Sequence, residues 1–348
     1  MRNKKTVVFW VLFLTACLLM TSCGIQTEPE QTMLVSAMGF DAIETKIRVT
    51  LEIPVVKDGK NSETKAVVLS EVGEDIPEAL QTIRAGLSRE LIFSHCALAV
   101  LGETLSKEQL QAVFDFAGSG ETLPLAAEVV SAESAQKLLD TGSFSAPAVG
   151  YELPEILERE RRQTGVNVRC SVYELRAVAS PELPVALPHF SVLGEDATPS
   201  IRWDGLAILR PHAQAFRLTA EESVPYAIIR GEWKANEGKD WIGSARLQKL
   251  RSSLTVAEQE NGLSISLMLR GELVGGTADD TALLTERLTA QTEALFARVQ
   301  RELGEDVLGI GERLRREASD AWSGVESRYG ALFGTSVFRM ECVIEVKG

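Results

Sequence analysis

Three histidines are the residues in this chain best suited to acid-base or metal chemistry, and they lie in separate segments. They are His95, His189 and His212. A zinc site needs three or four ligands at short, regular spacing, and the chain has no Cys-x-x-Cys pair and no histidine cluster. Gly-x-Ser-x-Gly and Walker-type loops are also absent from the sequence. We therefore expect no catalytic residue, metal or cofactor, and interpret His95, within an apolar run, as a core histidine.

Three further segments have both a chemical and a structural interpretation. Gly309-Ile-Gly311 lacks the preceding strand and third glycine of a nucleotide loop, so we interpret it as a helix-to-helix junction where backbone approaches backbone. Asp279-Asp280 fits a helix N-cap better than a cation site. The helix expected from Glu152 to Gln163 carries opposite charges three or four residues apart, which is typical of a solvated face rather than an acid cluster.

The beginning of the chain has the composition of a secretory signal. Three cations lie among the first five residues, an apolar run extends from Val7 to Met20, and Met20-Thr-Ser-Cys23 resembles a lipobox. Basic residues ahead of an apolar run hold the N-terminus in the cytoplasm while the remainder is exported. The pattern predicts a signal peptide over residues 1–22 and Cys23 as the lipid-bearing first residue of the mature protein.

Two alternatives to cleavage before Cys23 remain open. Leu14-Thr-Ala-Cys17 also matches a lipobox, although cleavage before Cys17 leaves an apolar core of only about eight residues. The segment from Thr6 to Ile25 is also nearly long enough to span a bilayer uncleaved, which takes about 20 residues. Each alternative still places the rest of the chain outside the cytoplasm and against a membrane.

Charge and cysteine content limit the function further. The 348-residue chain has a net charge of −13, which becomes −16 when the three cations of residues 1–22 are removed. Such an acidic surface argues against binding to nucleic acid and against adsorption to anionic lipid. Attachment of the protein to the membrane should therefore come from the N-terminal lipid anchor. Cys96, Cys170 and Cys342 are widely spaced, which favours buried free thiols over a disulfide between two of them.

Strand and helix patterns alternate through the first half. Lys46 to Val56 alternates apolar and polar residues, which predicts a half-buried strand paired with Met33 to Phe40. Asp75 to Arg89 predicts a helix with Asp75 as N-cap, and Leu91 to Leu101 predicts a strand covered on both faces. The other elements expected there are a helix over 107–116, a strand over 125–131 and a helix over 133–139.

A second set of elements follows a stretch over 194–200 that is typical of a linker. A long helix from Thr281 to Leu303 is expected, with Asp279 or Asp280 as N-cap. The strands expected there are 203–209, 232–241, 246–255 and 263–273, the last two joined at Asn261-Gly262, and a terminal strand around 338–346. The predicted class is α+β, with two or three mixed α/β domains and mixed sheets. The expected domains are 23–195, either whole or as two subdomains divided near 142–150, and 200–348.

Several motifs together resemble the Ger(x)C lipoproteins, the C subunits of spore germinant receptors. The resemblance is carried by Met38-Gly-Phe-Asp41, Ser94-His95 ahead of Gly102-Glu103, Trp203-Asp-Gly205-Leu-Ala207, Asp306-Val-Leu-Gly309-Ile-Gly311, Trp322, Tyr329, Phe333 and the terminal strand. Gly24-Ile-Gln26 departs from the Trp-Asp pair that usually follows the lipobox cysteine of that family, and Tyr329 stands where Trp is frequent.

The resemblance implies a non-enzymatic receptor subunit with mixed α/β domains. Such a subunit is anchored by diacylglycerol, here on Cys23, at the outer face of the inner spore membrane. It acts with polytopic A and B subunits in nutrient-triggered germination. The alternative from a different class is an extracytoplasmic lipoprotein that binds a solute or hydrolyses an envelope polymer. That alternative requires a cleft with converging polar groups, and a deep pocket lined by His95 or Glu103 would support it.

Overall fold

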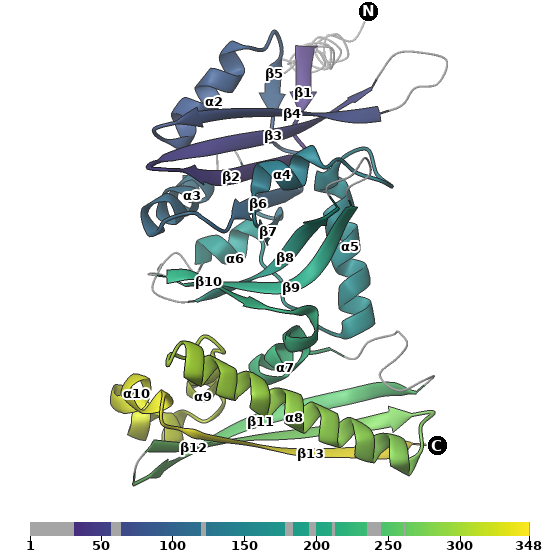
Figure 1. The fold of residues 1–348 in the computed structure, drawn as a ribbon, viewed down its shortest axis with the longest axis vertical. Helices are drawn as coiled ribbons and strands as arrows, with labels where there is room; N and C mark the ends of the chain where they lie inside the picture. Colours follow the sequence, from purple (N-terminus) through teal and green to yellow (C-terminus); the bar gives the residue numbers. More distant parts are fainter. Residues whose placement is uncertain are drawn as a thin grey trace, which may run out of the picture.

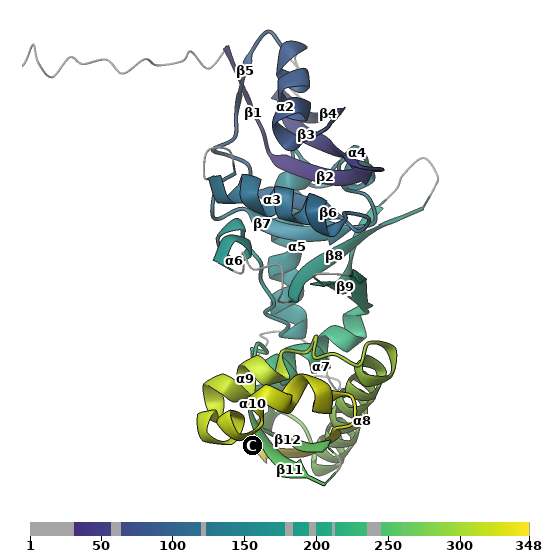
Figure 2. The ribbon, with the colours of Figure 1, turned by 90° about the vertical axis from the view of Figure 1, so that its left-hand side faces the viewer.

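The computed structural model describes residues 31–56, 64–119, 123–177, 184–194, 200–210, 213–234, 245–260 and 262–347. Two bodies follow each other along the longest axis (Figure 1 and Figure 2): an eight-stranded sheet with helices on both faces, and a three-stranded sheet with its helices. At the N-terminal end, β1 (Thr32–Leu34) pairs with β5 (Glu90–Ile92). The predicted class, α+β with mixed sheets, is confirmed.

Parallel strands form the centre of the eight-stranded sheet, and antiparallel strands form its edges. The order is β10-β9-β8-β7-β6-β2-β3-β4, in which β2, β6, β7 and β8 run parallel to their neighbours in that group. The strands are β2 (Ala37–Ile43), β3 (Lys46–Val56), β4 (Thr64–Gly73), β6 (Leu98–Gly102), β7 (Glu128–Ala132), β8 (Val185–Leu193), β9 (Ser200–Arg210) and β10 (Ala213–Leu218). Every residue of β6 is buried, as expected for a parallel strand covered on both faces.

Helices cover the two faces of this sheet. One face packs against α2 (Ile76–Ala85), α3 (Lys107–Ser119) and α6 (Val172–Ala177), and the other against α4 (Ala135–Asp140) and α5 (Val149–Thr164). Successive residues of β6 point to opposite sides: Leu98 and Val100 join the core of α4 and α5, whereas Ala99 and Leu101 join the opposite core. Asp75 caps α2 as predicted, by accepting a hydrogen bond from the Glu78 amide.

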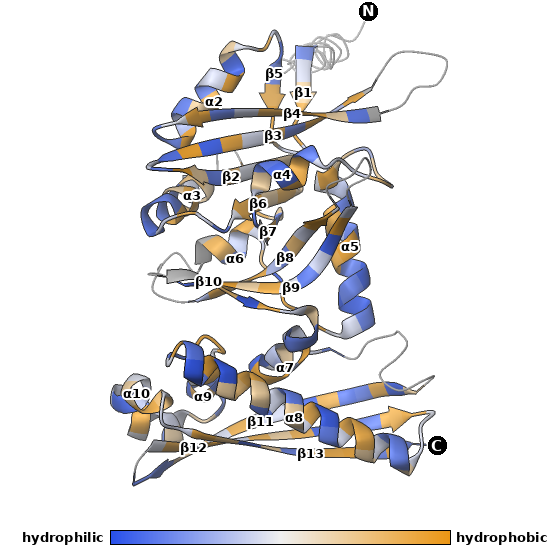
Figure 3. Ribbon diagram, in the orientation of Figure 1, coloured by the Kyte–Doolittle hydropathy of each residue, from blue (hydrophilic) through white to orange (hydrophobic). Residues whose placement is uncertain are grey.

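The second body is built on a hairpin and the terminal strand. Its elements are α7 (Ala220–Arg230), β11 (Arg246–Gln259), β12 (Gly262–Val274), α8 (Ala278–Glu302), α9 (Ile310–Glu317), α10 (Ser319–Phe333) and β13 (Val337–Lys347). β13 pairs parallel to β12, and hydrophobic residues alternate with hydrophilic ones along these strands (Figure 3). Leu206 and Ile208 of β9 and Phe216 of β10 lie in the same apolar core as these elements, so one core joins the two bodies.

One predicted strand is wrong in part. Leu91 to Leu101 is two strands, β5 and β6, which belong to different sheets. Ser94 and His95 form the turn between them, closed by a 2.8 Å hydrogen bond from the Cys96 amide to the Phe93 carbonyl oxygen. His95 is therefore exposed, and its interpretation as a core histidine is wrong.

Other elements match the predictions or were missed by them. The strand Lys46–Val56, the hairpin of β11 and β12, the helix α8 and the terminal strand are confirmed. Between 232 and 241 the structure has only an isolated bridge from Trp233 to Val166, and residues 235–244 lie outside the described part of the chain. The strands β4, β8 and β10 and the helix α7 were not predicted.

The expected domain boundaries fall inside the first body. β8 and β9 pair with each other on either side of the stretch 194–200, so the eight-stranded sheet continues across it. The stretch 142–150 joins α4 to α5, which pack on the same face of that sheet. The division into 23–195 and 200–348 stays a prediction. Among the residues described, no helix has both the length and the apolar character to cross a bilayer.

Candidate functional site

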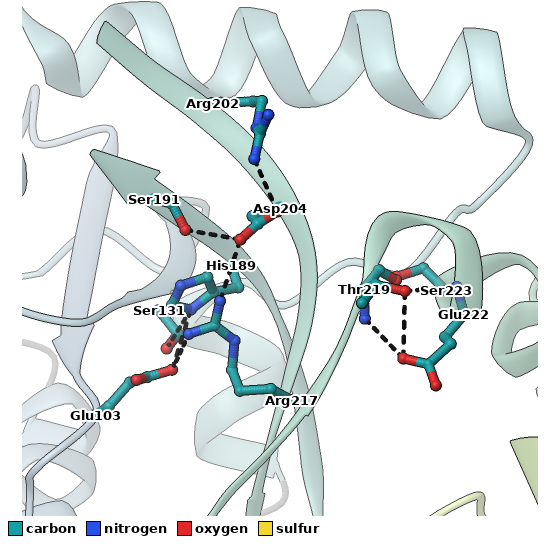
Figure 4. A network of polar contacts seen from close by, with 10 residues as sticks. All are labelled: Glu103, Ser131, His189, Ser191, Arg202, Asp204, Arg217, Thr219, Glu222 and Ser223. Atoms are coloured by element: carbon teal, nitrogen blue, oxygen red, sulfur yellow. Dashed lines mark hydrogen bonds and ion pairs between the residues drawn. The ribbon is translucent and has the colours of Figure 1, made fainter. Parts of the chain in front are cut away.

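Polar side chains from four neighbouring strands and from the end of a fifth gather at one place on the eight-stranded sheet (Figure 4). Glu103 directly follows β6, and the other members are Ser131 of β7, His189 of β8, Asp204 of β9 and Arg217 of β10. Ser131 and His189 are paired in the register of their strands, which places both side chains on the same face. We refer to these five residues as the cross-strand network.

Arg217 is the centre of the cross-strand network. Its Nη1 donates to Glu103 Oε1 at 2.6 Å, and its Nη2 approaches Asp204 Oδ2 at 3.4 Å. The Asp204 carboxylate also accepts a 2.9 Å hydrogen bond from the Ser191 hydroxyl. One arginine thus links the end of a central strand to both strands at the edge of the sheet.

His189 is a buried and neutral member of the network. Its side chain is 1% exposed, with Nδ1 at 3.2 Å from Ser131 Oγ and 3.4 Å from Glu103 Oε1. Burial, and after it the Arg217 charge, lower the pKa of His189 to about 3 against the opposing effect of Asp204. At neutral pH the imidazole is therefore a hydrogen-bonding group without charge.

Serine, histidine and glutamate are the residue types of a hydrolytic relay, but their geometry here differs from one. A relay holds the carboxylate at one imidazole nitrogen and the nucleophilic hydroxyl at the other. Ser131 and Glu103 instead both face Nδ1 of His189, and Ser131 is fully buried. The cross-strand network can bind strands together, but it presents no nucleophile to a substrate.

The N-terminal motif containing Asp41 positions a helix. The Asp41 carboxylate accepts hydrogen bonds from the amides of Ala135 at 2.7 Å and Gln136 at 2.8 Å, at the first turn of α4. Gly39 and Gly102 leave room for this arrangement: a Cβ on Gly102 would lie 2.3 Å from Asp41 Oδ1, and one on Gly39 would lie 2.8 Å from the Ala135 Cβ. These residues of the resemblance therefore fix α4 on the sheet.

Asp306 has the equivalent role in the second body. Its carboxylate accepts hydrogen bonds from the amides of Ile310 at 3.1 Å and Gly311 at 2.7 Å, and from the Tyr329 hydroxyl at 2.9 Å. Burial raises the pKa of Asp306, against the effect of these hydrogen bonds. The Asp306 motif thus starts α9 and attaches it to α10.

The two glycines of this motif lie against side chains. Gly309 has φ 68° as the N-cap of α9, and a Cβ there would overlap Arg230. A Cβ on Gly311 would lie 2.8 Å from Tyr329 and 3.0 Å from Trp322. The predicted junction between helices is confirmed, but the expectation that backbone approaches backbone there is wrong, because side chains fill the space.

The remaining candidate residues separate into three groups. Cys17, Cys23 and His212 lie outside the described residues.

Thr277 is the N-cap of α8, so the predicted caps Asp279 and Asp280 are wrong. The Thr277 hydroxyl accepts a hydrogen bond from the Asp280 amide, and the Asp280 carboxylate accepts one from the Thr277 amide. Cys96, Cys170 and Cys342 are free thiols, and burial raises the pKa of Cys96 to about 12. Among the described residues, no group of three or more His, Cys, Asp or Glu could hold a metal ion.

A cavity of about 190 Å³ lies where the two bodies meet. Arg169 and Glu174 line it from the first body, and Tyr226, Arg230 and Glu312 from the second. Arg230 is occupied by ion pairs with Glu232 at 3.1 Å and Glu312 at 3.3 Å. Neither this cavity nor a smaller one beside Arg161 is lined by His95 or Glu103.

The sequence did not reveal the cross-strand network, because its members are spread from residue 103 to residue 217. β8 and β10, which carry His189 and Arg217, were not among the predicted strands. The signal that was available is Glu103, a carboxylate directly after an apolar strand, where the carboxyl ends of neighbouring parallel strands also lie. The partner of that carboxylate comes from an antiparallel edge strand, which no local pattern indicates.

Comparisons with known proteins agree with the motifs. A family model described as "Spore germination protein N-terminal domain" matches residues 26–187. YfkR of Bacillus subtilis (strain 168), which is named as a spore germination protein, is 24% identical over 334 residues, covering 91% of this chain and 86% of YfkR. The crystal structure of the GerBC protein has a TM-score of 0.54 at 11% identity, covering 89% of this chain and 97% of GerBC, and so has a similar fold. Residues 26–187 therefore carry the N-terminal domain of the spore germination proteins.

Proposed function

We propose that this chain is a non-enzymatic C subunit of a germinant receptor, attached to the membrane by diacylglycerol on Cys23. It acts at the outer face of the inner spore membrane, in contact with polytopic A and B subunits. The observation that carries the proposal is the match of residues 26–187 to the spore germination domain. The signal-like first 22 residues and the lipobox ending at Cys23 support the anchor.

The anchor explains how a subunit without chemistry of its own contributes to a response. Tethering two partners to one membrane raises their effective concentration, so that weak contacts become occupied. The polar groups of the cross-strand network bond to one another. This supports a function of the body that depends on contacts made by its surface. The net charge of −16 after residues 1–22 disfavours adsorption to anionic lipid and leaves the lipid chain as the attachment.

Substitution of the lipidated residue tests the anchor. In spores that carry Cys23→Ala, we expect the chain to move from the membrane fraction to the buffer fraction and nutrient-triggered germination to slow. Cys17→Ala is the matched control, because the same change six residues earlier should leave both readouts unchanged. Wild-type attachment and germination in the Cys23→Ala spores would contradict this anchor, and the reverse result would assign it to Cys17.

A further inference from the structure

Phe144 is the most exposed large hydrophobic residue described in this chain. It lies between α4 and α5 with 101% relative exposure, compared with 62% for Tyr173, the next highest. An exposed aromatic ring gains a large burial free energy when a partner covers it, and aromatic residues are enriched at the centres of interfaces.

A single carboxylate holds the backbone on both sides of Phe144. Glu152 accepts hydrogen bonds from the Ser143 hydroxyl at 2.6 Å, the Phe144 amide at 3.0 Å, the Ser145 amide at 3.1 Å and the Ser145 hydroxyl at 2.6 Å. The Ser143 hydroxyl also accepts a 2.9 Å hydrogen bond from the Ala146 amide. The ring is therefore presented by an ordered turn, which reduces the entropy lost when it binds.

The base of this turn is attached to the core of the sheet. Glu52, 0% exposed, accepts hydrogen bonds from the amides of Val149 at 2.7 Å and Gly150 at 2.8 Å, at the start of α5. Ala148, the residue before the helix, is fully buried. Two carboxylates thus hold this region: the buried Glu52 holds the start of α5, and the more exposed Glu152 holds the turn before it. Phe144 projects from the turn that Glu152 holds.

The surroundings of the ring favour a protein pocket over a bilayer. Its neighbours in the turn are Gly142, Ser143, Ser145 and Ala146, which add no second apolar anchor. Partial burial raises the pKa of Glu152, but the hydrogen bonds outweigh it, so the pKa lies below its ordinary value and the carboxylate stays ionised. Insertion into lipid would carry this charge toward the hydrocarbon, whereas a protein pocket can receive the ring and leave Glu152 at a polar rim.

We propose that Phe144 is a preorganised knob that inserts into an apolar pocket on the extracytoplasmic surface of a polytopic partner subunit. The ring fills the pocket, and the small residues of the turn let the two backbones approach closely. This inference rests on the proposed function, because it assumes a polytopic partner, and it adds the point of contact.

Site-specific crosslinking in intact spores tests the contact. A photoreactive phenylalanine analogue is placed at position 144 in the full, lipidated chain, and at position 173 as a control on another exposed aromatic. We expect a crosslink from position 144 to a polytopic membrane protein, and at least about tenfold less from position 173. Crosslinks from position 144 only to lipid, only to a second copy of this chain, or to nothing would overturn the inference.

A second variant separates this inference from the proposed function. Phe144→Ala should weaken copurification of polytopic proteins with this chain by about tenfold or more, the effect of truncating an interface anchor, while Tyr173→Ala leaves it unchanged. Copurification at wild-type levels from Phe144→Ala spores would overturn the knob and leave the proposed function standing. The absence of polytopic partners even from wild-type spores would instead contradict the proposed function itself.

Discussion

The cross-strand network and the Phe144 turn use polar groups in opposite ways. In the network, the Glu103 carboxylate contacts both Arg217 and His189 across the sheet. In the turn, the Glu152 carboxylate is directed at its own backbone and leaves an apolar ring outside. Polar groups in this body therefore stabilise the fold, whereas the large side chain left exposed to solvent is hydrophobic.

Removal of Arg217 should have the largest effect on stability. Arg217→Met leaves the Glu103 carboxylate, whose side chain is 18% exposed, without its cation, and we expect the unfolding free energy to fall by about 2 kcal/mol. Urea unfolding of the purified chain measures it. Arg202→Met is the control, since that 60% exposed side chain contacts Asp204 only at 3.4 Å. Equal losses of unfolding free energy in the two variants would show that Arg217 stabilises the fold no more than an exposed arginine does.

Acid should destabilise the fold through His189. The folded pKa is about 3 and the ordinary value is 6.5, so between these pH values the unfolded chain binds a proton that the folded chain does not. Stability from this group is present above pH 6.5 and is lost as the pH falls, by about 2 kcal/mol at pH 5. Urea unfolding from pH 5 to pH 8 of the wild type and of His189→Gln tests this, because the variant should lack that part of the pH dependence. Parallel profiles would contradict a neutral buried imidazole.

The Glu152 turn should affect local order more than global stability. Glu152→Ala removes four hydrogen bonds to the turn, and we expect a loss of about 1 kcal/mol, similar to the loss of a helix cap. Hydrogen exchange at the amides of Phe144 and Ser145 should become faster than in Glu155→Ala, which changes an exposed carboxylate on the same helix. Unchanged exchange at these amides would mean that the turn is ordered by something other than Glu152.

The smallest effect on stability, and the sharpest contrast with Arg217, is expected for Phe144→Ala. A fully exposed ring contributes nothing to the folded core, so the unfolding free energy should stay within about 0.5 kcal/mol of the wild type. Nutrient-triggered germination of spores with this variant should nevertheless slow, because the ring acts in the assembly. Thermal unfolding together with the germination rate measures both. A loss of stability equal to that of Arg217→Met would show that Phe144 belongs to the fold.

Local sequence patterns predicted those elements that have a strong period. The strand Lys46–Val56 and the helix α8 were found because one face of each is buried and the other is solvated. Leu91 to Leu101 was misread because its apolar residues enter two different sheets, and only the turn at Ser94-His95 separates them. An apolar run does not indicate which sheet each of its residues joins. In this region the assignment to sheets depends on strand pairing in the tertiary structure.

The site residues were less predictable than the elements. Asp41, Asp306 and their glycines were noticed through family resemblance, but their work as helix caps depends on contacts between segments up to 95 residues apart. Arg217 and Glu103 meet across 114 residues of sequence. Phe144 was passed over inside a glycine- and proline-rich stretch, because its full exposure follows from how Glu152 folds that stretch back on itself.

Copurification from intact spores is the most direct test of whether this chain is a contact subunit of a membrane receptor. Proteins in wild-type spores are crosslinked chemically, and this chain is purified through an affinity tag under denaturing conditions. We expect two polytopic membrane proteins to be recovered with it, and their recovery to fall sharply from Cys23→Ala spores. Recovery of this chain alone, or with only non-membrane proteins, would contradict its assignment as a contact subunit of a membrane receptor.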